Sequence, residues 1–172
     1  EIVGEIAVPL SSPDFGPYMQ RIKDAKPDAI FMWFPSGELA NTMLKAYRAR
    51  GLDADGIVAL GTSDLVDDNS LDSMGEDAVG LITAAHYSAA HDSELNKAFV
   101  QAYNEVSGGS PRPNFMGVAA YDGLAAIYKV TEELGGDVSD GKKVMELLTG
   151  MTFESPRGQI EISAEDRDIV QN

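Results

Sequence analysis

The stretch Pro27–Gly51 has the clearest arrangement of hydrophobic and polar positions in the chain. Residues 28–34 form an apolar run without alternation. Such a run is typical of a central parallel strand, because neither side of that strand meets water. The pattern therefore predicts a strand covered on both faces, with Trp33 buried in the sheet.

A turn and a helix follow this strand. Pro35, Ser36 and Gly37 interrupt the apolar run, and a helical pattern opens at Glu38. Gly51 follows the last periodic position, where a helix C-terminus favours a left-handed residue. Ligands of open parallel sheets bind beyond the carboxyl ends of the strands. The turn is therefore predicted to lie at a ligand-facing edge of the sheet.

The remaining pattern predicts further strands alternating with helices. The predicted elements are strands at 2–8, 57–60 and 80–83, helices with apolar faces at 15–22, 65–74, 95–106, 114–134 and 140–148, and extended pieces at 152–154 and 158–162. Asp92 or Ser93 is the expected cap of the 95–106 helix. Alternation with short connections favours right-handed crossovers, so the fold class is α/β with a parallel doubly wound sheet.

The composition changes at residues 107–113, the strongest linker signal in the chain. It predicts an α/β domain over 1–110 and an incomplete domain over 111–172. The helix at 114–134 is apolar around much of its circumference, so burial on more than one side is expected. The second part offers little sheet for that helix to cover. The chain is therefore expected to be a piece of a larger protein or to assemble with another copy.

Charge and composition exclude several function classes. The 172 residues include 28 acidic and 13 basic side chains, a formal charge of −15, which disfavours nucleic-acid binding. The absence of cysteine excludes disulfides, thiolate metal sites and cysteine nucleophiles. No apolar run approaches the roughly 20 residues of a membrane helix. The first residues lack the pattern of a signal peptide.

Catalytic and cofactor patterns are weak. Gly61–Leu65 lacks the second glycine of a nucleophile elbow, and no glycine-rich nucleotide loop is present. His86 and His91 have no carboxylate at a recurring metal-ligand spacing, and Asp67–Asn69 lacks the calcium-loop pattern. The chain is therefore predicted to be non-enzymatic, with no cofactor and no metal.

Several phrases together resemble the type I periplasmic solute-binding proteins of ABC importers, in particular the leucine/isoleucine/valine-binding branch. These phrases are Gly4-Glu5-Ile6 with Pro9, Asp14-Phe15 leading to Tyr18 and Arg21-Ile22, Lys26-Pro27-Asp28-Ala29-Ile30, Gly80-Leu81, Asn96-Lys97-Ala98-Phe99-Val100, Ala120-Tyr121-Asp122-Gly123, and Phe153 to Ile160. Their order and spacing cover nearly the whole chain. The resemblance implies a clamshell of two α/β lobes that closes on a small ligand. Residues up to about Gly109 resemble the second lobe, and the later part resembles the segment that returns to the first.

The resemblance also implies which residues line the ligand site. In the family, contacts from the second lobe come from the turns after its strands. In this sequence those turns contain Pro35, Ser36 and Gly37, then Thr62, Ser63 and Asp64, and finally Tyr87. Hydroxyls and free backbone N–H groups hold a carboxylate, and Asp64 is the candidate partner for an α-ammonium. A cap of a helix starting at Leu65 is the alternative role for Asp64, and a packed wall without ligand is the alternative for Tyr87.

The function implied by the resemblance is capture of a small solute and its delivery to a membrane permease. The location would be periplasmic or extracytoplasmic. Aliphatic amino acids, short amides and aromatic carboxylates all remain open as solutes. A cytosolic doubly wound enzyme or ligand-sensing domain is the alternative. A domain kept for assembly, with self-association through the incomplete lobe, is a third possibility.

Overall fold

The computed structural model describes residues 1–11, 13–109 and 112–171. These residues form two compact units, Glu1–Ala85 and His86–Asn172. The predicted boundary between residues 110 and 111 lies outside the described residues. The units divide before the 94–107 helix, which joins the second unit through an edge-to-face contact of Phe99 with Tyr121, 5.1 Å between ring centroids.

The first unit is a parallel sheet with helices. Its elements are α1 (Gly16–Ala25), β1 (Ala29–Met32), α2 (Glu38–Ala49), β2 (Val58–Thr62), the 3-10 turn η1 (Ser63–Val66), α3 (Leu71–Met74), η2 (Gly75–Ala78) and β3 (Ile82–Ala84). The strands lie in the order β1-β2-β3, and both pairs are parallel. The α/β class with a parallel sheet is thus confirmed.

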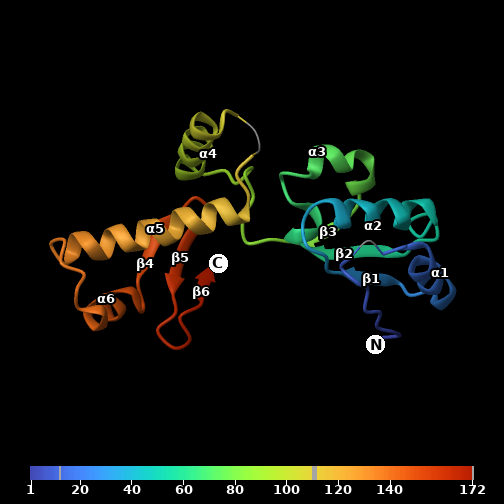
Figure 1. Ribbon diagram of the computed structural model, residues 1–172, viewed down its shortest axis with the longest axis horizontal. Helices are drawn as coiled ribbons and strands as arrows, with labels where there is room; N and C mark the ends of the chain where they lie inside the picture. Colours follow the sequence, from blue (N-terminus) through green and yellow to red (C-terminus); the bar gives the residue numbers. More distant parts are fainter. Residues whose placement is uncertain (12, 110–111, 172) are drawn as a thin grey trace. The chain divides into compact units, whose positions relative to one another are not determined.

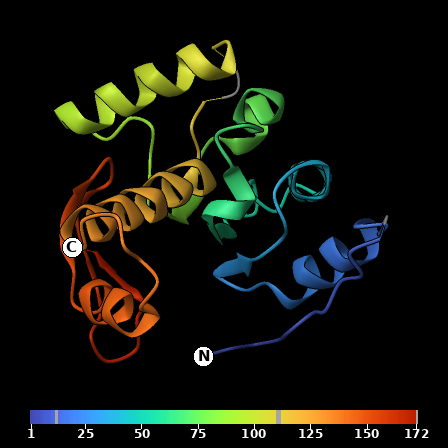
Figure 2. The same cartoon turned by 60° about the vertical axis from the view of Figure 1, so that its left-hand side comes forward.

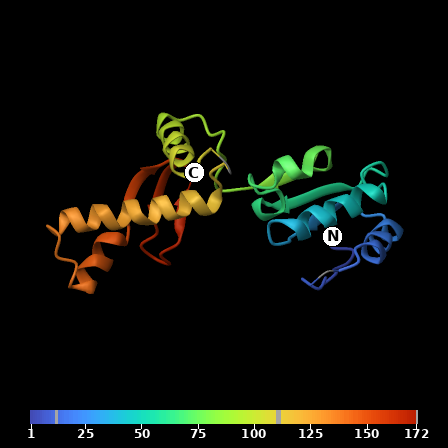
Figure 3. The ribbon, with the colours of Figure 1, turned by 45° about the horizontal axis from the view of Figure 1, so that its top comes forward.

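The core of this unit lies on one face of the sheet. Helix α2 buries Met43 and Leu44 completely, and these side chains pack with Ile30, Met32 and Ala59 from the strands. Helix α1 adds Met19 to the same cluster. Figures 1 and 3 show α2 lying along the sheet.

The opposite face of the sheet is bare, so the prediction of a strand covered on both faces is wrong for this chain. Phe31 is 69% exposed and Trp33 is 56% exposed, whereas Ile30 and Met32 are buried. The reason is that the helices packed on this sheet lie on its other face. The apolar stretch over 29–34 has apolar side chains on both faces of the sheet, but helices cover only one face.

Residues 1–9 form no strand, which corrects the prediction for 2–8. In the described residues the sheet of the first unit contains β1, β2 and β3, and residues 1–9 pair with none of them. Ile2 and Val3 are exposed, while Val8 packs partly against the core. An apolar alternation becomes a strand only where its backbone pairs with the edge of a sheet.

Arg48 fixes α2 to the segment that leads into β3. Its guanidinium donates to the carbonyl oxygens of Asp77, at 3.2 Å, and of Val79. It also pairs with the Asp53 carboxylate at 2.7 Å. The hydrogen bond from Arg48 holds the pKa of Asp53 below its usual value. One side chain therefore ties together the end of α2, the loop after it and the approach to β3.

The second unit is built on a long helix and an antiparallel sheet. Its elements are α4 (Glu94–Ser107), α5 (Phe115–Glu133), α6 (Gly141–Leu148), β4 (Thr152–Ser155), β5 (Gly158–Ile162) and β6 (Ile169–Gln171). The strands lie in the order β4-β5-β6. Ala126 of α5 packs with Phe153 and Ile160 of the sheet, and Figure 2 shows the helix running beside the strands.

The other sides of α5 are uncovered. Met116, Leu124, Ile127 and Tyr128 are each more than half exposed. The expected burial on more than one side is therefore not found in this chain. The sheet β4-β5-β6 covers one side of α5, and Val118 packs toward α4. The four exposed side chains named above have no neighbour among the described residues that covers them.

Three predicted helix boundaries are confirmed by their local chemistry. The Ser93 hydroxyl accepts from the Asn96 N–H at the start of α4, and the Asp140 carboxylate accepts from Lys142 and Lys143 N–H at the start of α6. Gly51 has φ +67° after the end of α2. The Ser93 and Asp140 side chains satisfy backbone N–H groups that the helices leave free, and the left-handed Gly51 ends α2.

A buried ion pair connects α5 to the sheet of the second unit. The Arg157 Nε donates to Asp122 Oδ2 at 2.8 Å, and both side chains are less than a tenth exposed. Arg157 Nη1 also donates to Gln171 Oε1 at 3.0 Å, and Gln171 Nε2 donates to the His86 carbonyl at 3.0 Å. The Gln171 side chain thus joins the end of the second unit to its start, and the Arg157 guanidinium joins that side chain to α5.

Candidate functional site

Six of the seven predicted site residues lie in the turns that follow β1 and β2. Pro35, Ser36 and Gly37 follow β1, and Gly37, with φ +107°, is the N-cap residue of α2. Thr62 ends β2, and Ser63 and Asp64 begin η1. Because Met32 pairs with Gly61 in parallel register, both turns leave the same carboxyl edge of the sheet on adjacent strands. The structure therefore brings these two groups together.

The hydroxyl and carboxylate groups of the second turn are partly exposed. Thr62, Ser63 and Asp64 are all half-buried. The Thr62 hydroxyl donates to Asp64 Oδ2 at 3.1 Å, which leaves the second carboxylate oxygen free of this bond. Asp64 is the second residue of η1, so it does not cap a helix starting at Leu65. The contact with Thr62 orients the carboxylate at the edge of the sheet.

Gly61 is what allows this turn to fold closely against the end of β2. A Cβ at this position would lie 2.5 Å from Leu65 Cδ2 and 3.2 Å from the Met32 carbonyl oxygen. Leu65 is completely buried, so it has no room to move aside. The missing side chain therefore lets η1 turn back over the strand and holds Asp64 where it is.

Replacing Gly61 by alanine is expected to destabilise the first unit by about 1–3 kcal/mol, because the added methyl overpacks a filled core. Urea unfolding followed by the fluorescence of Trp33 measures this change. Gly80→Ala is the comparison variant. At Gly80 φ is +83° and an added Cβ would meet nothing within 4 Å, so this variant introduces backbone strain without overpacking. A Gly61→Ala variant as stable as the unmodified chain would contradict the proposed role of the clash.

Tyr87, the seventh predicted residue, belongs to the second unit and is buried. Its hydroxyl donates to Asn96 Oδ1 at 3.0 Å, and its ring meets Phe99 edge-on at 6.1 Å between centroids. The residue is 6% exposed. These contacts describe a packed aromatic side chain, which was the alternative role for Tyr87.

Asn96 was not predicted as a site residue, although it begins the phrase Asn96–Val100. It is 1% exposed, and its Nδ2 donates to the carbonyl oxygens of Ala89 at 3.0 Å and His91 at 2.8 Å. Together with the bond to Tyr87, these contacts hold the loop over 87–93 against α4. The only signal in the sequence is an asparagine next to Leu95 on the apolar side of a helix.

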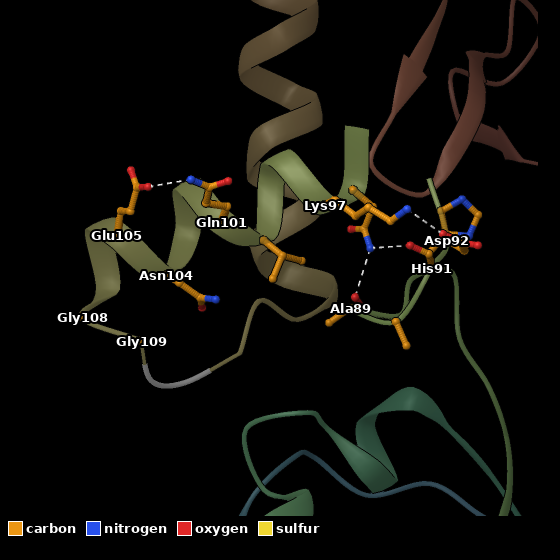
Figure 4. A pocket seen from close by; sticks show the side chains of 12 residues that line it. Ala89, His91, Asp92, Lys97, Gln101, Asn104, Glu105, Gly108 and Gly109 are labelled. Carbon is orange, nitrogen blue, oxygen red and sulfur yellow. Dashed lines mark hydrogen bonds and ion pairs between the residues drawn. The ribbon is translucent and has the colours of Figure 1, made fainter. Parts of the chain in front are cut away.

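The second unit also contains an open groove of about 810 Å³ along α4 and the loop over 89–92. Figure 4 shows that its polar side chains bond to one another. Lys97 pairs with Asp92 at 3.0 Å, and Gln101 donates to Glu105 at 3.1 Å. None of the predicted site residues lines this groove.

The charged groups at the edge of the first sheet are acidic. Asp64 and the exposed Glu38 lie in or next to the two turns, which otherwise contain neutral residues. Such an edge suits a cation such as an α-ammonium, and free N–H groups at the start of α2 suit a carboxylate. Within the described residues, no cluster of three metal-ligating side chains and no helix capable of crossing a membrane are found.

Comparison with known proteins gives a match over the whole chain. The model of a family described as periplasmic binding protein matches residues 1–172. The Leu/Ile/Val-binding protein homolog 6 of Brucella abortus (strain 2308) is 40% identical over 172 residues. These residues are 100% of this chain and 44% of the relative. The chain thus spans less than half the length of the curated relatives it matches.

Solved structures show the same relationship. A solute-binding protein of an ABC transporter from Rhodopseudomonas palustris BisB5, in complex with 3,4-dihydroxybenzoic acid, is 48% identical with a TM-score of 0.85. The match covers 97% of this chain and 45% of that one. A solute-binding protein from Rhodopseudomonas palustris HaA2, in complex with p-hydroxybenzoic acid, is 39% identical with a TM-score of 0.91, over 99% of this chain and 46% of that one. Sequence, strand topology and these matches agree that the chain belongs to the periplasmic binding protein family.

Proposed function

We propose that this chain is part of the solute-binding component of an ABC importer, and that the turns after β1 and β2 form one wall of its ligand site. The observation that supports this most directly is the meeting of Ser36 and Thr62–Asp64 at one carboxyl edge of a parallel sheet. The family consists of transporter solute-binding proteins, which are not enzymes. The enzyme alternative therefore has no support from the relatives.

The proposed mechanism follows from the position of the site residues. The turns after β1 and β2 would contact only one side of a ligand. A small solute would be captured between this wall and a facing lobe, and hinge closure would create the shape that a membrane permease recognises. The proposed location is outside the cytoplasm, which the family name supports. The residues proposed for the wall are Pro35, Ser36, Gly37, Thr62, Ser63 and Asp64. Tyr87 is proposed as a packed aromatic side chain of the second unit.

The names of the relatives suggest two classes of solute, amino acids and hydroxybenzoic acids. The charged groups at the carboxyl edge of the first sheet distinguish between them. One relative is named for leucine, isoleucine and valine, and two solved structures hold hydroxylated benzoic acids. An amino acid has an α-ammonium that pairs with Asp64, whereas a hydroxybenzoate presents only a carboxylate and a neutral ring and hydroxyl. An acidic edge without a basic side chain favours the amino acid on this wall.

The test uses a full-length chimera in which this chain replaces the matched 172 residues of the Brucella relative. Leucine and 4-hydroxybenzoate are titrated calorimetrically into the chimera and into its Asp64→Asn variant. We expect the substitution to weaken leucine binding by about 10- to 100-fold, roughly 1.5–3 kcal/mol, because a charge-assisted hydrogen bond is lost. Binding of 4-hydroxybenzoate should stay unchanged or improve.

Glu76→Gln, an exposed acidic residue in η2, provides the matched control for the loss of one negative charge. This variant should bind both ligands like the unmodified chimera. Equal weakening of leucine and 4-hydroxybenzoate by Asp64→Asn would remove the ammonium role. No effect on either ligand would remove Asp64 from the proposed wall.

A further inference from the structure

The two units of this chain are joined through a short stretch of backbone. The division falls between Ala85 and His86. Ala84 is the last residue of β3 and pairs with Thr62, a residue of the proposed ligand wall. Ala85 belongs to no helix or strand, and Tyr87 is buried in the second unit. Rotation of one unit against the other would therefore occur in the backbone of Ala85 and His86. We call these two residues the joint.

The joint is held by a side chain that lies 85 residues later in the sequence. Gln171, the last residue of β6, donates through Nε2 to the His86 carbonyl oxygen at 3.0 Å and to the Arg157 carbonyl oxygen at 3.2 Å. Its Oε1 accepts from Arg157 Nη1 at 3.0 Å. A flipped amide would put its oxygen against two carbonyl oxygens, so these contacts fix one orientation of the Gln171 side chain.

The support of Gln171 is itself anchored in the core of the second unit. Arg157 is 9% exposed, and its Nε donates to Asp122 Oδ2 of α5 at 2.8 Å. The guanidinium is therefore held by α5 while it holds the amide of Gln171. These contacts connect α5 to the joint through three side chains, which we call the relay: Asp122, Arg157 and Gln171.

We propose that Gln171 is a positioning residue for closure of the ligand site, because it holds the His86 carbonyl and limits the conformations of the joint before a solute binds. Hinges are a few loop residues that absorb the change in backbone angles when a site closes. A joint held near one conformation loses less conformational freedom on closure, which makes binding tighter. Gln171 thereby affects affinity through the joint. This inference rests on the proposed function, since it requires a site that closes.

Replacing Gln171 by glutamate separates the hold on the joint from the support of Arg157. The carboxylate still accepts from the guanidinium, but it has no hydrogen to donate to the His86 carbonyl. Gln171→Leu removes both contacts. We expect both variants to accelerate amide hydrogen exchange over residues 85–87 of the isolated chain to a similar extent. The thermal midpoint should fall by several degrees in Gln171→Leu and clearly less in Gln171→Glu, since only the glutamate leaves Arg157 an acceptor.

The effect on affinity is measured by calorimetric titration of the full-length chimera described above. Every ligand that the unmodified chimera binds, leucine or 4-hydroxybenzoate, should bind Gln171→Glu more weakly by a similar factor of about 3- to 10-fold. The factor is shared because the relay acts on closure and not on the chemistry of the solute. Asp64→Asn, by contrast, is expected to weaken leucine selectively.

Gln159→Glu is the matched control for the added negative charge. Gln159 is an exposed residue of β5, so the substitution makes the same chemical change in the same sheet without altering the relay. Exchange over residues 85–87 and the affinity for both ligands should remain as in the unmodified protein. An effect equal to that of Gln171→Glu would assign the result to charge and would contradict the inference.

The remaining outcomes distinguish this inference from the proposed function. Unchanged exchange in Gln171→Glu would show that the relay does not hold the joint. Faster exchange with unchanged or tighter binding would show that the hold does not favour closure. A loss of leucine binding alone would place Gln171 at the ligand instead. Each of these results overturns only the present inference, whereas an unmodified chimera that binds neither ligand would overturn the proposed function and this inference with it.

Discussion

Replacing Arg157 by leucine is expected to destabilise the second unit by about 3–5 kcal/mol, because the change leaves the Asp122 carboxylate buried without its cation. The two side chains are 8% and 6% exposed, and their Nε–Oδ2 distance is 2.8 Å. The second oxygen of Asp122 is buried and makes no hydrogen bond within the described part of the chain. Water therefore does not replace the guanidinium unless the unit opens.

The same substitution also removes a hydrogen bond at the C-terminal end of the unit. Arg157 donates to Gln171, which in turn donates to the His86 carbonyl. Urea unfolding followed by far-ultraviolet circular dichroism measures the loss of stability. Trp33 fluorescence, which reports the first unit, shows whether the loss is confined to the second.

Lys142→Leu is the matched control for Arg157→Leu. Lys142 is an exposed cation that lies 3.8 Å from Glu146 on α6. Exposed ion pairs contribute little, so its removal should change stability by less than about 0.5 kcal/mol. A similar effect of both substitutions would contradict the importance of the buried pair. The double variant Asp122→Leu with Arg157→Leu should recover part of the loss, since no charge then remains buried.

Replacing Asn96 by leucine is expected to cost about 2–3 kcal/mol, because a side chain of similar size removes the partner of buried polar groups. The Tyr87 hydroxyl loses its acceptor, and the carbonyl oxygens of Ala89 and His91 lose their donor. The loop over 87–93 should therefore become looser while α4 keeps its Ser93 cap.

Thermal unfolding measures the stability of the Asn96 variant, and amide hydrogen exchange in residues 87–93 measures the loop. Gln101→Leu, an exposed position on the same helix that forms one hydrogen bond with Glu105, is the control. It should change stability by less than about 0.5 kcal/mol. Unchanged exchange in the loop of the Asn96 variant would show that the asparagine does not hold it.

Local patterns in the sequence determined much of this protein. Alternation of apolar runs and helical faces predicted the α/β class and the parallel strands, since those periods follow from backbone geometry alone. The caps at Ser93 and Asp140 and the left-handed Gly51 were equally predictable. The turns after β1 and β2 could be placed at one edge because parallel strands share their carboxyl ends.

Other features were decided only by the tertiary structure, because they depend on partners distant in sequence. Asp122 and Arg157 are 35 residues apart, and no local signal pairs them. The burial of Tyr87 depends on Asn96, and residues 1–9 form no strand because they do not pair with the sheet β1-β2-β3. The apolar run containing Trp33 records that both faces are suited to burial. Whether a face is buried depends on which helices are present to cover it.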